Sequence, residues 1–292
     1  MMKEMQNVAK LYESHRLYVY QSCMYIFHRL YVEVDDNMHQ DGESMEDIFD
    51  KVQKIFESYH LDSIYYHMNL VFEFLKLEYY NHYKVYRQAE KYFEEVNDAC
   101  GNLLVNYSTY TFPPQFLISK IERHLRTGTE AELYSENESI FMDYEIDMQD
   151  VPKHIIYIVY RAISCYYIGK FEEAAKLING LLNDVSLKKY PFAQLEIKSL
   201  LALQYTLMRD FELFNQLSNS IQRQIRLSEK DSCENIQLFL KILKIATSEA
   251  KKEKAKKINA VIPRLSTINV HYFAPTKLIK LDEKFVELLT DF

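Results

Sequence analysis

The chain contains few of the residues that interrupt helices. Its 292 residues include 5 glycines and 6 prolines, and tryptophan is absent. Because glycine and proline both disfavour helix interiors, a chain this poor in them can form long helices with short connections. The scarcity of glycine also excludes glycine-rich phosphate-binding loops and the dinucleotide-binding fingerprint, which need several glycines at fixed spacing.

Cysteine and long hydrophobic runs are also sparse. The four cysteines, at positions 23, 100, 165 and 233, form no short-spaced pair, so we interpret them as small core residues in a reducing compartment. No apolar run approaches the roughly 18 residues that a membrane span requires, and the N-terminal residues lack the apolar core of a signal peptide. These absences predict a cytoplasmic protein that does not contact a membrane.

Catalytic and metal-binding patterns are missing as well. No pair of histidines has the spacing and the intervening glutamate that a zinc protease helix uses. A calcium loop that places Gly42 at its sixth position would put Ile48 where calcium needs a bidentate glutamate. We therefore expect no catalytic residue, no cofactor and no metal, and we expect that the protein is not an enzyme.

The net charge of −7 argues against direct binding of nucleic acid, which requires a basic face. The charge is uneven, because acidic residues gather between Glu33 and Asp50 and basic residues between Lys241 and Arg264. Two interpretations stay open for the basic cluster: a solvated face of the last hairpin, or a contact with an acidic partner or the acidic loop of a second copy. The sequence thus leaves the oligomeric state uncertain.

Residues 157–182 form the most informative segment, which predicts two amphipathic helices joined at Gly169. Ile158, Ala162 and Cys165 fall at i, i+4 and i+7 and so lie on one helical stripe. Gly169 can adopt the left-handed conformation that ends such a helix. The second helix repeats the apolar spacing at Phe171, Ala174, Ile178 and Leu181.

The same pattern recurs at intervals of about 40 residues, forward twice and backward once from Phe171, with a further copy 85 residues back. A weaker sixth copy has Met45, Ile48, Val52 and Ile55. The prolines Pro114, Pro152 and Pro191 each precede an apolar helical run and support this register. Pro275 is expected to open one more helix. We predict a single domain over residues 1–292, with about 12 to 14 helices arranged as about six hairpins and a capping helix at about 275–290.

The pattern resembles the tetratricopeptide (TPR) repeat family in the small Ala162, the aromatic Phe171 after the turn and the small Ala174. Other copies depart from it, since Arg209 replaces the turn glycine and Phe214 stands where a small residue belongs. The interval also exceeds the roughly 34 residues of the standard repeat. The resemblance implies an all-α fold, in which TPR-like hairpins stack into a right-handed α-solenoid with the first helices on the concave face.

The resemblance also implies which positions face that concave groove. They are a mixture of polar, charged and aromatic residues: Asn69, Lys76, Tyr79, Gln115, Glu122, Tyr166, Glu196, Ser199 and Lys244. Such a surface suits a protein or peptide ligand, whose identity the sequence does not specify.

Two functions follow from these expectations. The first is a non-catalytic scaffold that binds a protein or peptide in the concave groove. The second is a regulator similar to the peptide-responsive bacterial TPR proteins, which act on a response regulator or transcription factor. The repeat interval and the tyrosine-rich residues 64–93 favour such kinship, whereas residues 1–60 show no DNA-reading helix-turn-helix and no identifiable catalytic glutamine.

Overall fold

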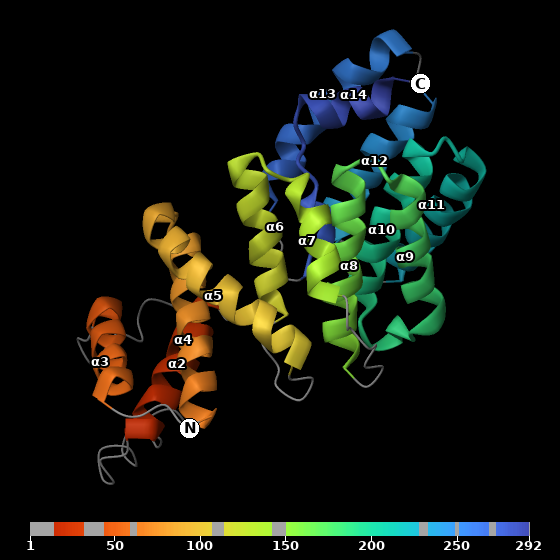
Figure 1. Cartoon of the computed structure of the whole chain (residues 1–292). Coiled ribbons are helices and arrows are strands. Elements are labelled where there is room, and N and C mark those ends of the chain that lie inside the picture. The colour runs from red at the N-terminus through yellow and green to blue at the C-terminus, as the bar shows by residue number, and fades with distance from the viewer. Residues whose placement is uncertain are drawn as a thin grey trace. The chain divides into compact units, whose positions relative to one another are not determined.

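The structure is a computed structural model that describes residues 15–31, 44–58, 63–106, 114–141, 150–227, 233–248, 251–268 and 273–291. These residues form 13 α-helices and two 3₁₀ helices and contain no strand, which confirms the predicted all-α class and helix number (Figure 1). No helix among them is long and apolar enough to cross a membrane.

The chain divides into two compact units, Met1–Phe116 and Leu117–Phe292, where the sequence predicted one continuous domain. The boundary falls in the first turn of α6 (Gln115–Thr127). Two clusters of buried hydrophobic residues lie within the N-terminal unit, so this unit has a core of its own. The repeat spacing alone does not show such a division, because it continues across the boundary.

The N-terminal unit contains α2 (His15–Tyr31), α3 (Met45–Ser58), α4 (Ser63–His82) and α5 (Tyr86–Asn106), and α4 packs against the other three. Its core is rich in aromatic rings. The ring of Phe49 meets that of Phe72 nearly edge-on at 5.9 Å, and Phe56 meets Tyr65 in the same way at 6.2 Å. Aromatic pairs of this geometry add to the stabilisation that burial provides.

The C-terminal unit is a series of helical hairpins. It continues from α6 with α7 (Glu132–Phe141), α8 (Val151–Tyr167), α9 (Phe171–Asp184), a 3₁₀ turn η2 (Leu187–Lys189), α10 (Pro191–Leu207), α11 (Phe211–Arg226), α12 (Glu234–Ser248) and α13 (Lys251–Thr267). Helix α8 packs against α9, α10 against α11, and α12 against α13, and α10 also packs against α9 and α12. The hairpin predicted over residues 157–182 is the α8–α9 pair.

Four hairpin turns have the same backbone conformation. The residues with positive φ are Lys84 (59°), Gly128 (75°), Gly169 (77°) and Arg209 (62°), so Arg209 adopts the conformation of the glycine that it replaces. In each turn the amide of the residue after the positive-φ residue donates to the carbonyl five residues before it, as in Lys170 N to Cys165 O at 2.9 Å. The four turns therefore confirm the predicted register, including the copy 85 residues before Phe171.

The C-terminal end differs from the single capping helix expected at about 275–290. A short 3₁₀ helix η4 (Pro275–Leu278) is followed by extended backbone at Ile279, and α14 (Glu283–Thr290) then begins. The carboxylate of Asp282 accepts a hydrogen bond from the Phe285 amide at 3.1 Å and caps α14. Pro275 does open a helical turn, but burial of the extended Ile279 separates it from the last helix.

Candidate functional site

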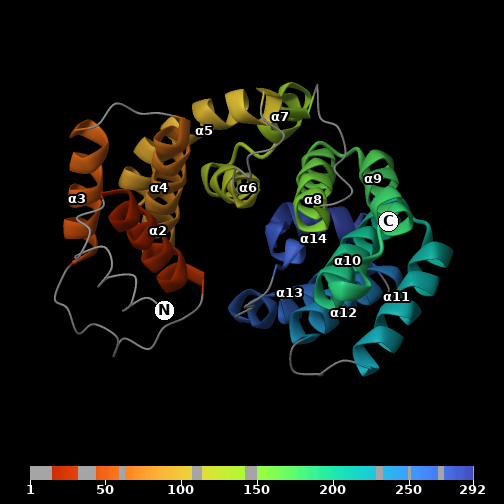
Figure 2. The same cartoon turned by 90° about the horizontal axis from the view of Figure 1, so that it is seen from below.

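Residues 273–282, which we call the strap, lie against the first helices of successive hairpins. We call the surface that α8, α10 and α12 present to the strap the first-helix face. In Figure 2 the second helices α9 and α11 lie on one side of the row formed by α8, α10 and α12. Helix α10 contacts both η4 and α14, and α12 also contacts α14.

A buried carboxylate on α10 holds one end of the strap. Glu196 is only 2% exposed, and one of its oxygens accepts hydrogen bonds from the Thr276 amide (3.0 Å) and the Thr276 hydroxyl (2.6 Å). Its other oxygen accepts a hydrogen bond from the side-chain amide of Asn235 on α12. Burial raises the pKa of Glu196, and the three donors oppose that rise. A carboxylate this enclosed needs such donors, because an unpaired buried charge is costly.

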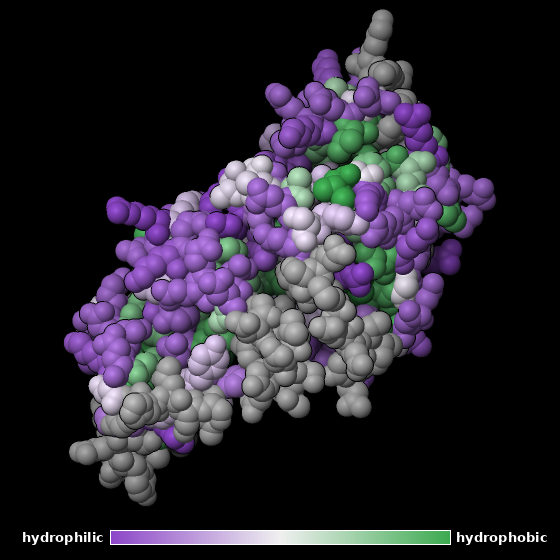
Figure 3. All heavy atoms as spheres, viewed as in Figure 1, coloured by the Kyte–Doolittle hydropathy of each residue, from purple (hydrophilic) through white to green (hydrophobic). Residues whose placement is uncertain are grey.

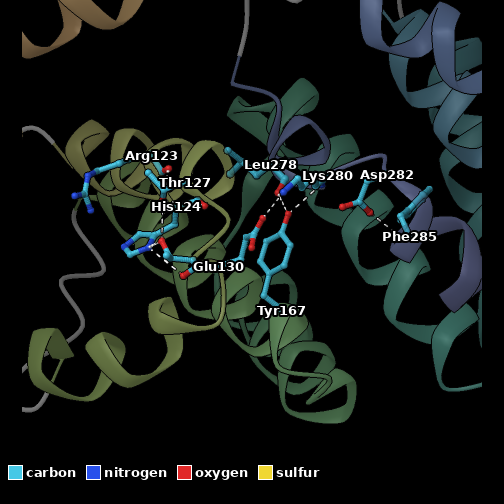
Figure 4. A network of polar contacts seen from close by, with 10 residues as sticks. Arg123, His124, Thr127, Glu130, Tyr167, Leu278, Lys280, Asp282 and Phe285 are labelled. Atoms are coloured by element: carbon cyan, nitrogen blue, oxygen red, sulfur yellow. Dashed lines mark hydrogen bonds and ion pairs between the residues drawn. The ribbon is translucent and has the colours of Figure 1, made fainter. Parts of the chain in front are cut away.

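A tyrosine at the end of α8 holds the other end (Figure 4). The Tyr167 hydroxyl donates to the Leu278 carbonyl at 2.7 Å and accepts from the Lys280 amide at 3.0 Å. It thus bonds to both a backbone donor and a backbone acceptor of the strap. Burial raises the pKa of Tyr167 well above its ordinary value, so the hydroxyl remains protonated and able to donate.

An ion pair at the surface completes the contact. The Lys280 ammonium lies 2.7 Å from the carboxylate of Glu130, which belongs to the turn between α6 and α7. Partial burial of Glu130 acts to raise its pKa, but the hydrogen bond and charge of Lys280 outweigh this effect, and the pKa lies below the ordinary value. Ion pairs this exposed contribute little to stability, so this one mainly fixes the register of the strap.

A polar cluster near the strap consists of Thr129, His124 and Glu136. It has the sequence of hydroxyl, imidazole and carboxylate found in catalytic triads. His124 Nδ1 lies 2.8 Å from the Thr129 hydroxyl and 3.1 Å from the Thr129 carbonyl, and its Nε2 lies 3.6 Å from Glu136. His124 is 1% exposed and joins α6 to the turn at Gly128. Because Nδ1 also faces a carbonyl oxygen, the cluster suits a role in holding this turn rather than in activating Thr129.

One cavity of about 500 Å³ opens where α14 meets the ends of two hairpins. Three hydrophobic side chains and two charged residues of each sign line it: Phe171, Leu207, Leu288, Arg209, Lys284, Glu287 and Asp291. Figure 3 shows hydrophobic residues at the surface of the C-terminal unit between hydrophilic ones. None of these lining residues belongs to the strap, so we assign the cavity no ligand.

The nine predicted groove residues are distributed over both units. Four have buried side chains (Lys76, Tyr166, Glu196 and Ser199), four are half-buried (Asn69, Tyr79, Gln115 and Lys244), and Glu122 is exposed. Internal contacts account for the buried ones in this structure, as when the Ser199 hydroxyl donates to the Leu195 carbonyl. That these nine residues line one groove stays a prediction.

Two of the nine lie at the strap. Glu196 bonds to Thr276 directly, and Tyr166 lies close enough to Asp282 that, after burial itself, the charge of Asp282 raises the pKa of Tyr166. The sequence interpretation did not identify Tyr167, Glu130, Asn235, Thr276 or Lys280. Their contacts join residues 39 to 150 positions apart, and no local spacing indicates such pairs.

No protein-family model, no curated protein and no solved structure matches the chain. Within the described ranges, no group of three or more histidine, cysteine, aspartate or glutamate side chains is placed to hold a metal ion. The function must therefore be argued from the strap and the face that holds it.

Proposed function

We propose that the protein is a non-catalytic scaffold that binds a protein or peptide segment on the first-helix face of a TPR-like α-solenoid. The observation that carries the proposal is that this face already holds a short segment, the 3₁₀ turn η4 and the extended Ile279 after it, through bonds to its backbone. Tyr167 bonds to the carbonyl of Leu278 and the amide of Lys280, and Glu196 accepts from the amide of Thr276. Side chains that bond to backbone atoms can also bind another peptide whose backbone has a similar shape, because these bonds do not depend on the peptide's side chains.

Stacked hairpins supply the geometry that such binding needs. Each first helix presents side chains to the same face, and short turns fix the helices against one another. In the C-terminal unit this arrangement brings Tyr167 of α8 and Glu196 of α10 to one segment, while Asn235 of α12 donates to Glu196. Rigid helices hold these groups in place before a ligand arrives, which lowers the entropy cost of binding.

Peptide display on the full-length chain tests the proposal. Selected peptides should perturb NMR signals of α8, α10 and α12, and Tyr167→Phe should weaken their binding about ten-fold, because it removes a hydroxyl bonded to peptide backbone. Tyr205→Phe is the matched control, since the Tyr205 hydroxyl accepts from Asn179 of α9 on the second-helix side. Perturbations confined to other surfaces, or equal losses in the two variants, would contradict the proposal.

The division into two units favours a second candidate, the peptide-responsive regulator. In such a protein an N-terminal helical bundle acts on the target, while the repeats bind the peptide. The unit formed by α2 to α5 could serve as the bundle. Addition of the chain to a phosphorylated response regulator separates the two candidates: faster loss of the phosphoryl group supports the regulator, and an unchanged rate leaves the scaffold.

A further inference from the structure

We infer that the strap is an internal ligand of the first-helix face, and that the external ligand is a peptide with the same chemistry. This inference rests on the proposed function. The peptide would carry a hydroxyl residue, apolar residues two and three positions later, and a basic residue four positions later. In the strap these are Thr276, Leu278, Ile279 and Lys280.

Each element of this pattern meets a complementary group. The Thr276 hydroxyl donates to Glu196 at 2.6 Å, and valine in its place would leave that carboxylate short of a donor. Leu278 and Ile279 are buried between the bonds to Glu196 and those to Tyr167. The Lys280 ammonium meets Glu130 at 2.7 Å. Backbone bonds to Tyr167 give affinity, while the hydroxyl, apolar and basic positions give selectivity.

Contacts outside the bonds to the first-helix face hold the neighbours of the strap. Helix α13 precedes it and α14 follows it, and α14 is held by its own buried residues Phe285, Val286 and Leu289. The Arg209 side chain also donates to the Asp291 carbonyl beyond α14, at 3.2 Å. None of these contacts involves the bonds that Glu196, Tyr167 and Glu130 make to the strap.

Tethering makes the strap a strong competitor. A segment linked at both ends acts at an effective concentration on the order of millimolar, so a free peptide with equal contacts must approach that concentration to replace it. A ligand can overcome this competition in two situations. Either the partner makes additional contacts with the protein, or the strap makes fewer contacts with the first-helix face. Weakening the strap by mutation reproduces the second situation in the full-length chain.

The test uses a fluorescent peptide with the strap sequence FAPTKLIKLD and measures its binding by anisotropy. The full-length variant Thr276→Val/Lys280→Ala should bind the peptide at least ten-fold more tightly than the wild-type chain. Glu283→Gln, which changes an exposed residue just after the strap, should bind it like the wild type. A peptide with valine at the Thr276 position should bind the double variant at least ten-fold more weakly.

Each other outcome overturns a stated part of the account. Equal binding to all three chains would show that the strap does not compete, which overturns the inference and leaves the scaffold function intact. No binding to the double variant, with faster hydrogen exchange of its strap amides, would overturn the inference too, and the display experiment would then decide the function. If the double variant fails to fold, Lys280→Ala alone repeats the test with a smaller expected gain, because the Lys280 side chain is exposed and its ion pair contributes little.

Discussion

Two buried charged groups, one in each unit, are satisfied in different ways. In the N-terminal unit, the Lys76 ammonium lies 2.7 Å from Glu73, one turn away on the same helix, and over the ring of Tyr92. In the C-terminal unit, Glu196 receives neutral donors, two of them from Thr276, 80 residues away. The closest partner of Lys76 is thus in its own helix, whereas Glu196 is satisfied by a segment that is distant in the sequence.

The largest effect is expected from breaking the local pair. Lys76→Met should lower the free energy of unfolding by about 3 kcal/mol, because Glu73 would stay buried without its closest cation. Urea denaturation measures this loss. The double variant Lys76→Met/Glu73→Leu should recover most of it, since both charges are then absent. A single-variant loss below about 1 kcal/mol would show that the pair matters little to this unit.

A smaller effect is expected from substituting a buried alanine in each unit. These substitutions test whether the two helices of a hairpin approach closely at the same repeat position in both units. Ala174 and Ala89 occupy equivalent repeat positions and are fully buried in the second helices of their hairpins. Leucine at either position should overpack the hairpin by about 1–3 kcal/mol. Ala260→Leu, on the exposed face of α13, is the control and should be nearly neutral. Thermal melting unmoved by Ala174→Leu would contradict the repeat register.

The turns provide the next prediction. Gly169→Ala should cost about 1–2 kcal/mol, because its φ of 77° is strained for any residue with a Cβ, although nothing lies within 4 Å of the added atom. Gly180→Ala should stabilise by about 0.5–1 kcal/mol, because Gly180 lies inside α9 with helical backbone. Chemical denaturation of the two variants side by side gives the comparison. If both substitutions changed the free energy of unfolding equally and in the same direction, Gly169 would not have the positive φ that the four turns share.

The smallest expected effect is a change in pH dependence. The pKa of Glu196 is raised by burial in the folded chain, so folding binds a proton between the ordinary carboxyl pKa and this raised value. Wild-type stability should therefore fall, relative to Glu196→Gln, as pH rises through that window. The Glu73 carboxyl also has a raised pKa, but it is present in both chains and cancels. Parallel stability profiles from pH 4 upward would refute the assignment.

The hairpins could be predicted from sequence because their causes are local. Gly169, Ala174 and the 3.6-residue periodicity act within one turn or one helix contact, and the register extended correctly to Arg209, which lacks the glycine signal. The unit boundary and the strap could not be predicted in this way. The bonds that Tyr167 and Glu196 make to the strap join distant residues, and nothing near either residue in the sequence indicates them.

Amide hydrogen exchange at Thr276 and Lys280 reports directly whether the first-helix face holds the strap in solution. Both amides donate to side chains of the first-helix face, to Glu196 at 3.0 Å and to Tyr167 at 3.0 Å. The account predicts that both exchange slowly in the wild-type chain and that Tyr167→Phe accelerates Lys280 more than Thr276. Exchange of both amides at the rates of an unstructured peptide in the wild-type chain would contradict it.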